Sequence, residues 1–282
     1  MAKFILSAFS DEYASDFDKQ LEGLRQNGIT HMEIRGVNGK NILSLTDEEV
    51  AEVRAKLDAS GIQLSSIGSP LGKISITDPM EPHLEMTRRA VQIAKALGTR
   101  NIRMFSFYIP DGKYAEYRNE VISRLAAMCE IAEAEDIFLC HENEKGIYGD
   151  NADRCLDLQN ALEGRLKCIF DPANFIQCHE QPYPHAFDLL GKKIYYMHIK
   201  DALEDGTVVP AGKGIGGLPE ILAQLKKNDQ TYFLTLEPHL RVFAGLEALE
   251  NGEKTKMTFT YSSGEEAFGA ASDALKDILN SL

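Results

Sequence analysis

Cysteine and long apolar runs are both scarce in this chain of 282 residues. The five cysteines are odd in number and show no Cys-x-x-Cys spacing, which indicates reduced, packed thiols rather than a disulfide framework. No apolar run approaches the roughly 20 residues that span a bilayer. The apolar stretch near the amino terminus is too short for the core of a signal peptide and is typical of a first strand. We therefore expect a cytoplasmic protein with no membrane partner.

Positive charge is also limited, because 30 basic residues face 43 acidic ones and leave a formal net charge of −13. Such an excess of negative charge opposes binding to a phosphate backbone, so no nucleic acid is expected as a partner. No glycine-rich phosphate loop follows the first predicted strand, which disfavours an open, doubly wound nucleotide-binding sheet. The glycine-rich stretch at 211–217 precedes a helix without a clear strand before it, so it does not supply that loop.

What the chain does contain is a regular alternation of β-rich segments and helical patterns. Apolar residues at helical spacing mark the helices, and one helix is bounded by a capping Thr46 and a terminating Gly61. Each predicted strand is followed by a helix, and the strands lie at 3–9, 30–36, 62–70, 101–110, 137–144, 166–175, 193–201 and 231–240. No linker or low-complexity tract divides the chain. Eight such units over roughly 250 residues predict an α/β fold, a (β/α)₈ TIM barrel forming a single domain over 1–282.

Metal-ligand side chains stand at the ends of the last four predicted strands. Active sites of such barrels lie at these carboxyl ends, and alternation along the strands gives the side chains a common inward face. The four residues are Glu142, Asp171, His198 and Glu237. Three carboxylates and one imidazole repel one another unless a divalent cation binds among them. The oxygen-rich set favours one Mn²⁺ or Mg²⁺ ion, with Co²⁺ and Zn²⁺ as alternatives. The competing interpretation makes each acid a solvated residue or a helix cap.

These residues, together with several short stretches, resemble a known superfamily. The stretches are 65–74, 102–108, 141–150, 170–175, 198–202 and 233–240. They make the chain similar to the xylose isomerase-like TIM-barrel superfamily over essentially its whole length. That superfamily includes sugar and sugar-phosphate isomerases and epimerases and the endonuclease IV branch, and the chain resembles its sugar phosphate isomerase/epimerase type.

The resemblance implies a reaction for two of the glutamates. In the epimerase branch the corresponding residues bind one divalent metal, and Glu142 and Glu237 would stand on opposite faces of a keto sugar. One would remove the α-proton, and the other would return it through a metal-bound enediolate. The expected activity is that of a metal-dependent sugar or sugar-phosphate isomerase or epimerase, with Mn²⁺ as the first choice. Two positions depart from the epimerase pattern, since Asn174 replaces a histidine and Glu204 an arginine, so the substrate must be held differently.

Further polar residues near the strand ends are expected to bind substrate. They are Asn174, Lys200, Glu144, Glu33, Arg35 and Lys145. For some a structural role stays open: Asn174 in a local turn, Lys200 in solvent, and Glu33 and Arg35 as an ion pair inside the barrel. The long loop at about 240–263 is expected to act as a lid or to contact a neighbouring subunit of a homo-oligomer.

Three other functions compete with this one. The same site could eliminate a leaving group from a keto sugar, a 3-keto glycoside or a keto-inositol, which would make the protein a lyase or dehydratase. An abasic-site endonuclease would need a trinuclear zinc cluster with more histidines than these strand ends offer. A non-catalytic sugar-binding or scaffold role would keep the barrel and tolerate loss of the metal.

Overall fold

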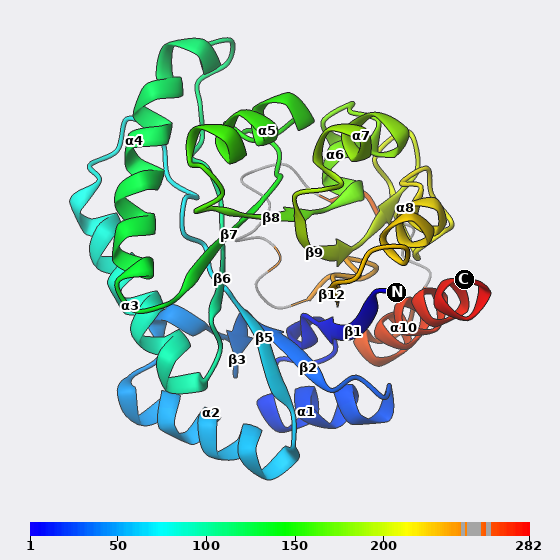
Figure 1. Cartoon of the computed structure of the whole chain (residues 1–282). Coiled ribbons are helices and arrows are strands. Elements are labelled where there is room, and N and C mark those ends of the chain that lie inside the picture. Colours follow the sequence, from blue (N-terminus) through cyan, green and yellow to red (C-terminus); the bar gives the residue numbers. More distant parts are fainter. Residues whose placement is uncertain (244–245, 247–254, 258–260) are drawn as a thin grey trace.

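Eight parallel strands close into a barrel, as the sequence predicts. The computed structural model describes residues 1–243, 246, 255–257 and 261–282. The barrel strands are β1 (Lys3–Ala8), β2 (His31–Ile34), β5 (Gln63–Gly68), β6 (Asn101–Met104), β7 (Phe138–Glu142), β8 (Lys167–Phe170), β9 (Ile194–Ile199) and β12 (Thr231–Leu236). Their order around the barrel is β1-β12-β9-β8-β7-β6-β5-β2, so the first strand pairs with the last (Figure 1).

Helices surround the barrel on its outside (Figure 1). They are α1 (Phe17–Gln26), α2 (Asp47–Ser60), α3 (Glu81–Leu97), α4 (Tyr114–Glu133), α5 (Ala152–Ala161), α6 (Pro172–Gln177), α7 (Phe187–Leu190), α8 (Leu218–Leu225) and α10 (Gly264–Ser281).

The predicted ends of α2 are confirmed. Thr46 and Glu49 form a capping box, and Gly61 ends the helix in the left-handed conformation that glycine adopts without a steric cost. Among the described residues, no helix is long and apolar enough to cross a membrane.

The predicted sixth strand is too long. It was expected to reach Phe175, but β8 ends at Phe170 and α6 begins at Pro172. Proline suits the first turn of a helix because its fixed φ is helical and its missing N–H has no partner to lose there. Asp171 caps this helix by accepting a hydrogen bond from the Asn174 backbone N–H at 2.9 Å. This short helix therefore starts directly at the end of the strand and at the edge of the site.

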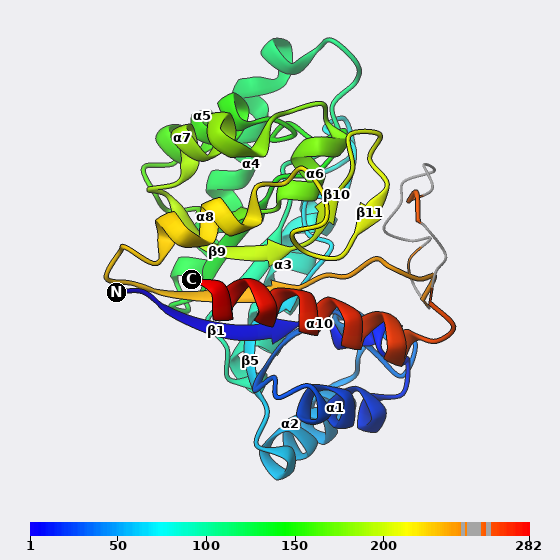
Figure 2. The same cartoon turned by 90° about the vertical axis from the view of Figure 1, so that its right-hand side faces the viewer.

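Two small antiparallel hairpins were also not predicted from the sequence. One joins β3 (Gly36–Val37) to β4 (Lys40–Asn41), and the other joins β10 (Asp201–Ala202) to β11 (Val208–Val209). Figure 2 shows β10 and β11 at the opposite end of the barrel from the two chain termini. Most of the predicted loop at 240–263, including 247–254, lies outside the described residues.

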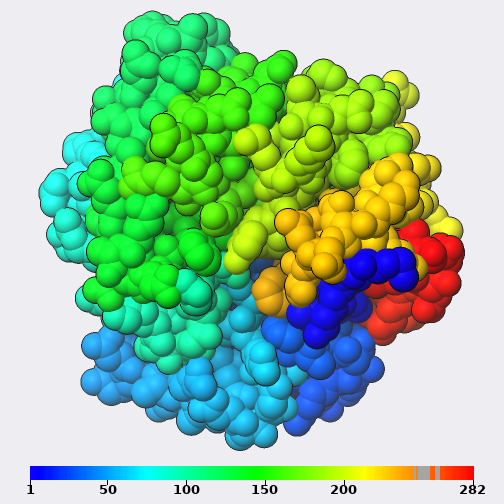
Figure 3. Space-filling model, in the orientation of Figure 1, coloured from blue at the N-terminus to red at the C-terminus, as the bar shows by residue number. Residues whose placement is uncertain are grey.

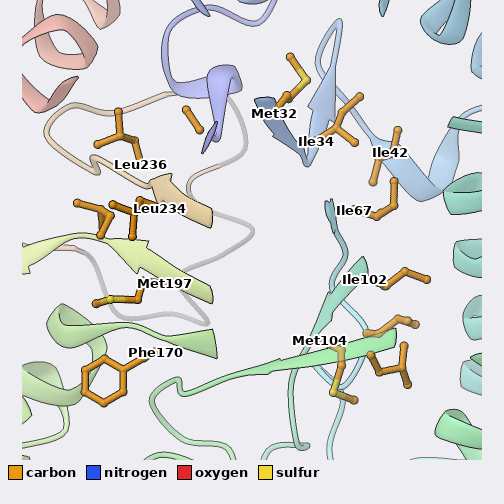
Figure 4. Close-up of a cluster of buried hydrophobic side chains, with 14 of the residues drawn as sticks. Met32, Ile34, Ile42, Ile67, Ile102, Met104, Phe170, Met197, Leu234 and Leu236 are labelled. Carbon is orange, nitrogen blue, oxygen red and sulfur yellow. The ribbon is translucent and has the colours of Figure 1, made fainter. Parts of the chain in front are cut away.

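The main hydrophobic core lies between the strands and the helices. Side chains on the outward faces of six strands, among them Met32, Ile67, Phe170 and Leu234, point away from the barrel axis (Figure 4). Burial of each such side chain contributes about 1.5–3 kcal/mol to folding. The barrel interior is then free to carry polar groups, such as the Ser7 and Ser65 hydroxyls, which lie 2.6 Å apart.

The first and last parts of the chain close the barrel together. Strand β1 is in register with β12 over all six of its residues, from Lys3 opposite Thr231 to Ala8 opposite Leu236. The pairing continues at the edge, where the Lys3 backbone N–H donates to the Gln230 carbonyl at 2.9 Å. Figure 3 shows the face at this end, with the blue amino-terminal residues between orange and red segments from the other end of the sequence. The strand ends that carry the site open on the opposite side.

Candidate metal centre and cavity

The ligand-type residues at the ends of the last four strands come together. One ligand atom each from Glu142, Asp171, His198 and Glu237 lies within 4.8 Å of every other. All four residues are at most 2% exposed. Two donors on opposite sides of a bound divalent ion are about 4.2 Å apart, from metal–oxygen distances of about 2.1 Å. The group thus has the spacing that a single divalent ion requires.

The orientation of His198 is fixed from both sides of its ring. Its Nε2 lies 3.2 Å from Glu33 Oε2, and its Nδ1 lies 2.9 Å from Glu142 Oε1 and 3.5 Å from Glu237 Oε2. Glu33 in turn accepts a hydrogen bond from the Tyr196 hydroxyl at 3.1 Å. Burial alone would lower the pKa of His198, but Glu142 and Glu33 hold it well above its usual value, so the ring donates from Nδ1 to Glu142 and from Nε2 to Glu33. A divalent cation would displace the Nδ1 proton, while the contact between Nε2 and Glu33 would keep the ring directed at the ion.

Asp171 has two oxygens with separate environments. Its Oδ1 caps α6 through the Asn174 N–H. Its Oδ2 is buried and accepts no well-aligned hydrogen bond, although the Lys200 ammonium lies 3.0 Å away. Burial raises the pKa of Asp171 to about 7, against the effect of the Lys200 charge. A buried carboxylate oxygen that faces three other ligand atoms without a hydrogen bond fits a divalent cation, and the helix-cap interpretation holds for the other oxygen.

Two cations hold Glu237 in place. Lys200 Nζ lies 3.0 Å from its Oε2, and Arg35 Nη1 lies 3.0 Å from its Oε1. Burial alone would raise the pKa of Glu237, but Lys200 and His198 outweigh it, so the pKa lies well below its usual value. Glu237 is therefore a carboxylate at neutral pH despite its burial.

Arg103 connects the two glutamates. Its Nη1 lies 3.1 Å from Glu142 Oε2 and 3.8 Å from Glu237 Oε1. Burial alone would raise the pKa of Glu142, but His198 and Arg103 lower it to about 2. Both glutamates therefore share one guanidinium and are ionised together.

A second group of ligand-type residues adjoins the first but contains its own cation. Glu12, Glu237 and His239 offer atoms within 4.8 Å of one another. Arg35 already contacts the facing oxygens, at 3.2 Å from Glu12 Oε1 and 3.0 Å from Glu237 Oε1. A guanidinium at these oxygens takes the position that a second metal ion would need. Of the two groups found among the described residues, only the first suits a metal, which disfavours a multinuclear endonuclease centre.

A cavity of about 600 Å³ opens over the site. Four of the predicted substrate residues line it, namely Asn174, Lys200, Glu144 and Lys145, and Glu237 and Arg103 line it as well. Asn174 lies in α6 rather than in a local turn, and its Nδ2 donates to Glu142 Oε1 at 3.1 Å. Glu204, at the position where the sequence resemblance implies an arginine, also lines the cavity.

Glu33 and Arg35 do not line this cavity, contrary to their expected contact with substrate. Glu33 is fully buried beneath His198. Arg35 pairs with Asp11 and Glu12 as well as with Glu237, and not with Glu33 as the alternative interpretation supposed. Both residues therefore support the ligand residues from outside the cavity.

Comparison with known proteins agrees with this architecture. A family model for xylose isomerase-like TIM barrels matches residues 21–261. The chain belongs to the xylose isomerase-like TIM barrel family. No curated protein matches the sequence.

Solved structures share the fold of this xylose isomerase-like barrel at low sequence identity. The probable 3-DHS dehydratase AsbF from Bacillus anthracis is 17% identical, with a TM-score of 0.71 over 98% of this chain and 99% of that one. The IolI protein, solved with a zinc atom, is 15% identical, with a TM-score of 0.73 over 98% of both chains. An L-ribulose 3-epimerase is 15% identical, with a TM-score of 0.72 over 100% of this chain and 95% of that one.

Arg103 is the residue of this xylose isomerase-like site that sequence analysis missed. It lies in β6, between the apolar Ile102 and Met104, and is 3% exposed. A buried arginine needs an acidic partner, so an arginine inside a predicted barrel strand was a usable signal. Its partner Glu142 is 39 positions away and could not be assigned without the fold.

The glycine-rich stretch at 211–217 binds a carboxylate of the barrel itself. Asp201 Oδ2 accepts hydrogen bonds from the Gly212 and Gly214 N–H groups at 2.9 and 3.0 Å, and Oδ1 accepts from Gly216 and Ala202 at 2.9 Å each. Gly214 is required because a Cβ there would lie 2.2 Å from the Ala202 carbonyl oxygen. The loop therefore fixes the segment that follows Lys200.

Replacing Asp201 with asparagine is expected to destabilise the protein by about 2–3 kcal/mol. An amide offers one acceptor oxygen where the carboxylate offers two, so buried backbone N–H groups lose their partner. Urea unfolding followed by circular dichroism measures the effect. Asp229→Asn, at an exposed position, is the matched control. Equal unfolding free energies for the two variants would contradict the role given to Asp201.

Proposed function

We propose that this protein is a divalent-metal-dependent isomerase or epimerase that transfers a proton at the carbon beside a sugar carbonyl. The observation that carries the proposal is the pairing of two buried, ionised glutamates, Glu142 and Glu237, within one four-residue ligand group at the end of a cavity. Asp171 and His198 complete the group that would hold the ion. Mn²⁺ is the first choice, with Mg²⁺, Co²⁺ and Zn²⁺ as alternatives.

The chain's own residues would divide the proton transfer between them. When bound, the ion would polarise the sugar carbonyl and offset the negative charge of the enediolate. Glu237 lines the cavity and is ionised, so it is suited to remove the α-proton. In an isomerisation, Glu237 itself would return that proton to the neighbouring carbon. In an epimerisation, Glu142, which contacts the same Arg103 guanidinium and is also ionised, would first take up a proton from water and then donate it to the carbanion carbon. Arg103 lines the cavity and adds positive charge beside the developing oxyanion.

Elimination is the second candidate, and Lys200 is the observation that favours it. Its ammonium lines the cavity 3.0 Å from Glu237, so an acid stands beside the base. After proton removal, the carbon–oxygen bond to a β-leaving group would break as Lys200 donates a proton to the departing oxygen. Substrates would be keto sugars, 3-keto glycosides or keto-inositols. The structurally similar AsbF is described as a probable dehydratase.

Solvent-proton exchange tests the proposal. The protein is depleted of metal with a chelator, reloaded with Mn²⁺, and incubated in D₂O with a panel of keto sugars and 3-keto glycosides. We expect Mn²⁺-dependent deuterium uptake at the α-carbon, measured by mass spectrometry. Release of a leaving group at the same rate would assign a lyase, and uptake without release an isomerase or epimerase. Absence of exchange with every member of the panel would contradict the proposed function.

Two further features support the proposed compartment and the proposed kind of substrate. All five cysteines are free, and four of them are buried, which suits a reducing cytoplasmic compartment. A small sugar fits a cavity of about 600 Å³. We propose a small-molecule substrate, without nucleic acid or membrane, and leave the homo-oligomer as a prediction for sedimentation analysis.

A further inference from the structure

We infer that the substrate of this site is an uncharged sugar, and that the ion pair of Lys73 and Glu144 binds its hydroxyl groups and rejects a phosphate. The inference rests on the proposed function and names the substrate class within it. Lys73 follows β5 and Glu144 follows β7, and both side chains line the cavity. Lys73 Nζ lies 2.9 Å from Glu144 Oε2.

The Lys73 ammonium is confined on two sides. Besides the Glu144 carboxylate, the ring of Phe105 lies against it, with 4.5 Å between Nζ and the ring centroid. The Lys73 side chain is 9% exposed and that of Glu144 is 23% exposed. A largely buried pair keeps its geometry better than a surface pair and is screened less by salt. The charge that a phosphate would need from Lys73 is already balanced by Glu144.

The other cations of the cavity are engaged as well. Lys200 and Arg103 contact the ligand carboxylates. Lys256 Nζ donates to the Asp205 carbonyl at 2.8 Å, and Lys145 also interacts with a neighbouring group. Among the described residues that line the cavity, five cations (Lys73, Arg103, Lys145, Lys200 and Lys256) face five carboxylates (Asp111, Glu144, Glu204, Asp205 and Glu237). Glu142 and Asp171 behind them would be offset by one divalent ion, so the loaded site has no surplus positive charge.

The usual phosphate position of such barrels is also occupied by the protein. TIM barrels frequently bind phosphate with the loops after the seventh and eighth strands. Here the loop after β9, the seventh barrel strand, directs the N–H groups of Gly212, Gly214 and Gly216 at the carboxylate of Asp201. An internal anion thus takes the place of a phosphate in this loop.

An ion pair on a cavity wall suits a hydroxyl group better than a phosphate. A hydroxyl donates to the carboxylate and accepts from the ammonium, so one sugar oxygen satisfies both partners. A phosphate has acceptors only, and it would lose hydration while meeting the Glu144 charge. The pair therefore selects the neutral sugar over its phosphate ester.

Paired substrates test the selection. D-fructose with D-fructose 6-phosphate and D-ribulose with D-ribulose 5-phosphate are compared for deuterium uptake by the Mn²⁺-loaded protein. We expect kcat/KM for a free sugar to exceed that for its phosphate by at least about tenfold, which is about 1.4 kcal/mol. Faster exchange of a phosphate ester overturns the inference. Absence of exchange in both pairs would count against the proposed function. The inference about the substrate class is then tested by measuring phosphate binding.

Phosphate binding is measured by titration calorimetry with inorganic phosphate and the Mg²⁺-loaded protein, so it needs no turnover. The wild type is expected to show no saturable binding at millimolar concentrations, and Glu144→Gln is expected to bind at least about tenfold more tightly. Glu144→Asp keeps the charge and should behave as the wild type. Glu135→Gln, which removes the partner of exposed Lys95, is the control for a lost carboxylate elsewhere. Saturable binding by the wild type, or equal binding by wild type and Glu144→Gln, overturns the inference.

Discussion

Glu237→Gln is expected to lower the rate of α-proton exchange by at least about 10³-fold. General acid–base catalysis by a positioned side chain contributes about 10²–10⁴-fold, and this substitution also removes a charged ligand of the proposed ion. The amide has nearly the shape of the carboxylate but does not accept a proton at neutral pH. The measurement is deuterium uptake by the Mn²⁺-loaded variant under saturating sugar.

Glu142→Gln should cause a loss of similar size, because Glu142 also combines metal ligation with proton transfer. Glu135→Gln provides the same chemical change at an exposed position and should exchange at the wild-type rate. Metal content of each variant, measured after dialysis, separates loss of the ion from loss of the base. A Glu237→Gln variant that retains more than about a tenth of the wild-type rate would contradict the proton-transfer role.

Lys200→Met is expected to destabilise the metal-depleted protein by about 3–5 kcal/mol. Lys200 lies 3.0 Å from both Asp171 Oδ2 and Glu237 Oε2, and its side chain is 4% exposed. Removing Lys200 leaves the buried carboxylates without a compensating positive charge. Removing one partner of a buried ion pair costs about 3–5 kcal/mol of stability. Chemical denaturation in the presence of a chelator measures the effect.

Mn²⁺ should restore much of the stability that Lys200→Met loses. The ion would bind the carboxylates that Lys200 otherwise contacts, so the variant is also expected to bind Mn²⁺ more tightly than the wild type. An ion that binds only the native state stabilises the protein in proportion to the logarithm of its affinity. The same denaturation curves therefore report both the restored stability and the affinity for Mn²⁺. Lys200→Arg keeps the charge and is the matched control. Equal stability of the chelated wild type and Lys200→Met would show that the ammonium does not balance these acids.

The convergence of the ligand residues followed from topology, whereas their supporting contacts did not. Strands that run parallel in a closed barrel end on the same side, so Glu142, His198 and Glu237 could be placed together from alternation alone. The start of α6 was missed because Phe170-Asp171-Pro172 suits both a strand end and a helix cap. Asp171 therefore caps a helix with one oxygen and faces the ligand group with the other, whereas the sequence analysis treated these two roles as alternatives.

The alternation of side chains along a strand does not predict how deep in the barrel a residue lies. Alternation along the predicted strand at 30–36 places Glu33 and Arg35 on one face, yet Glu33 lies beneath His198 and Arg35 reaches Glu237 and Glu12. The pairing of β2 with β5 shifts register between Met32 and Glu33. This shift precedes both residues and moves both alike. What separates them is the end of β2 at Ile34, after which Arg35 no longer follows the alternation of the strand.

A Mn²⁺-soaked crystal tests the central claim most directly, because anomalous scattering locates the ion without reference to turnover. The account predicts one strong peak within about 2.0–2.4 Å of a carboxylate oxygen from each of Glu142, Asp171 and Glu237 and of His198 Nδ1. Substitution of His198 by alanine should weaken that peak. A peak at another place, or none at these residues while the protein binds Mn²⁺ in solution, would contradict it.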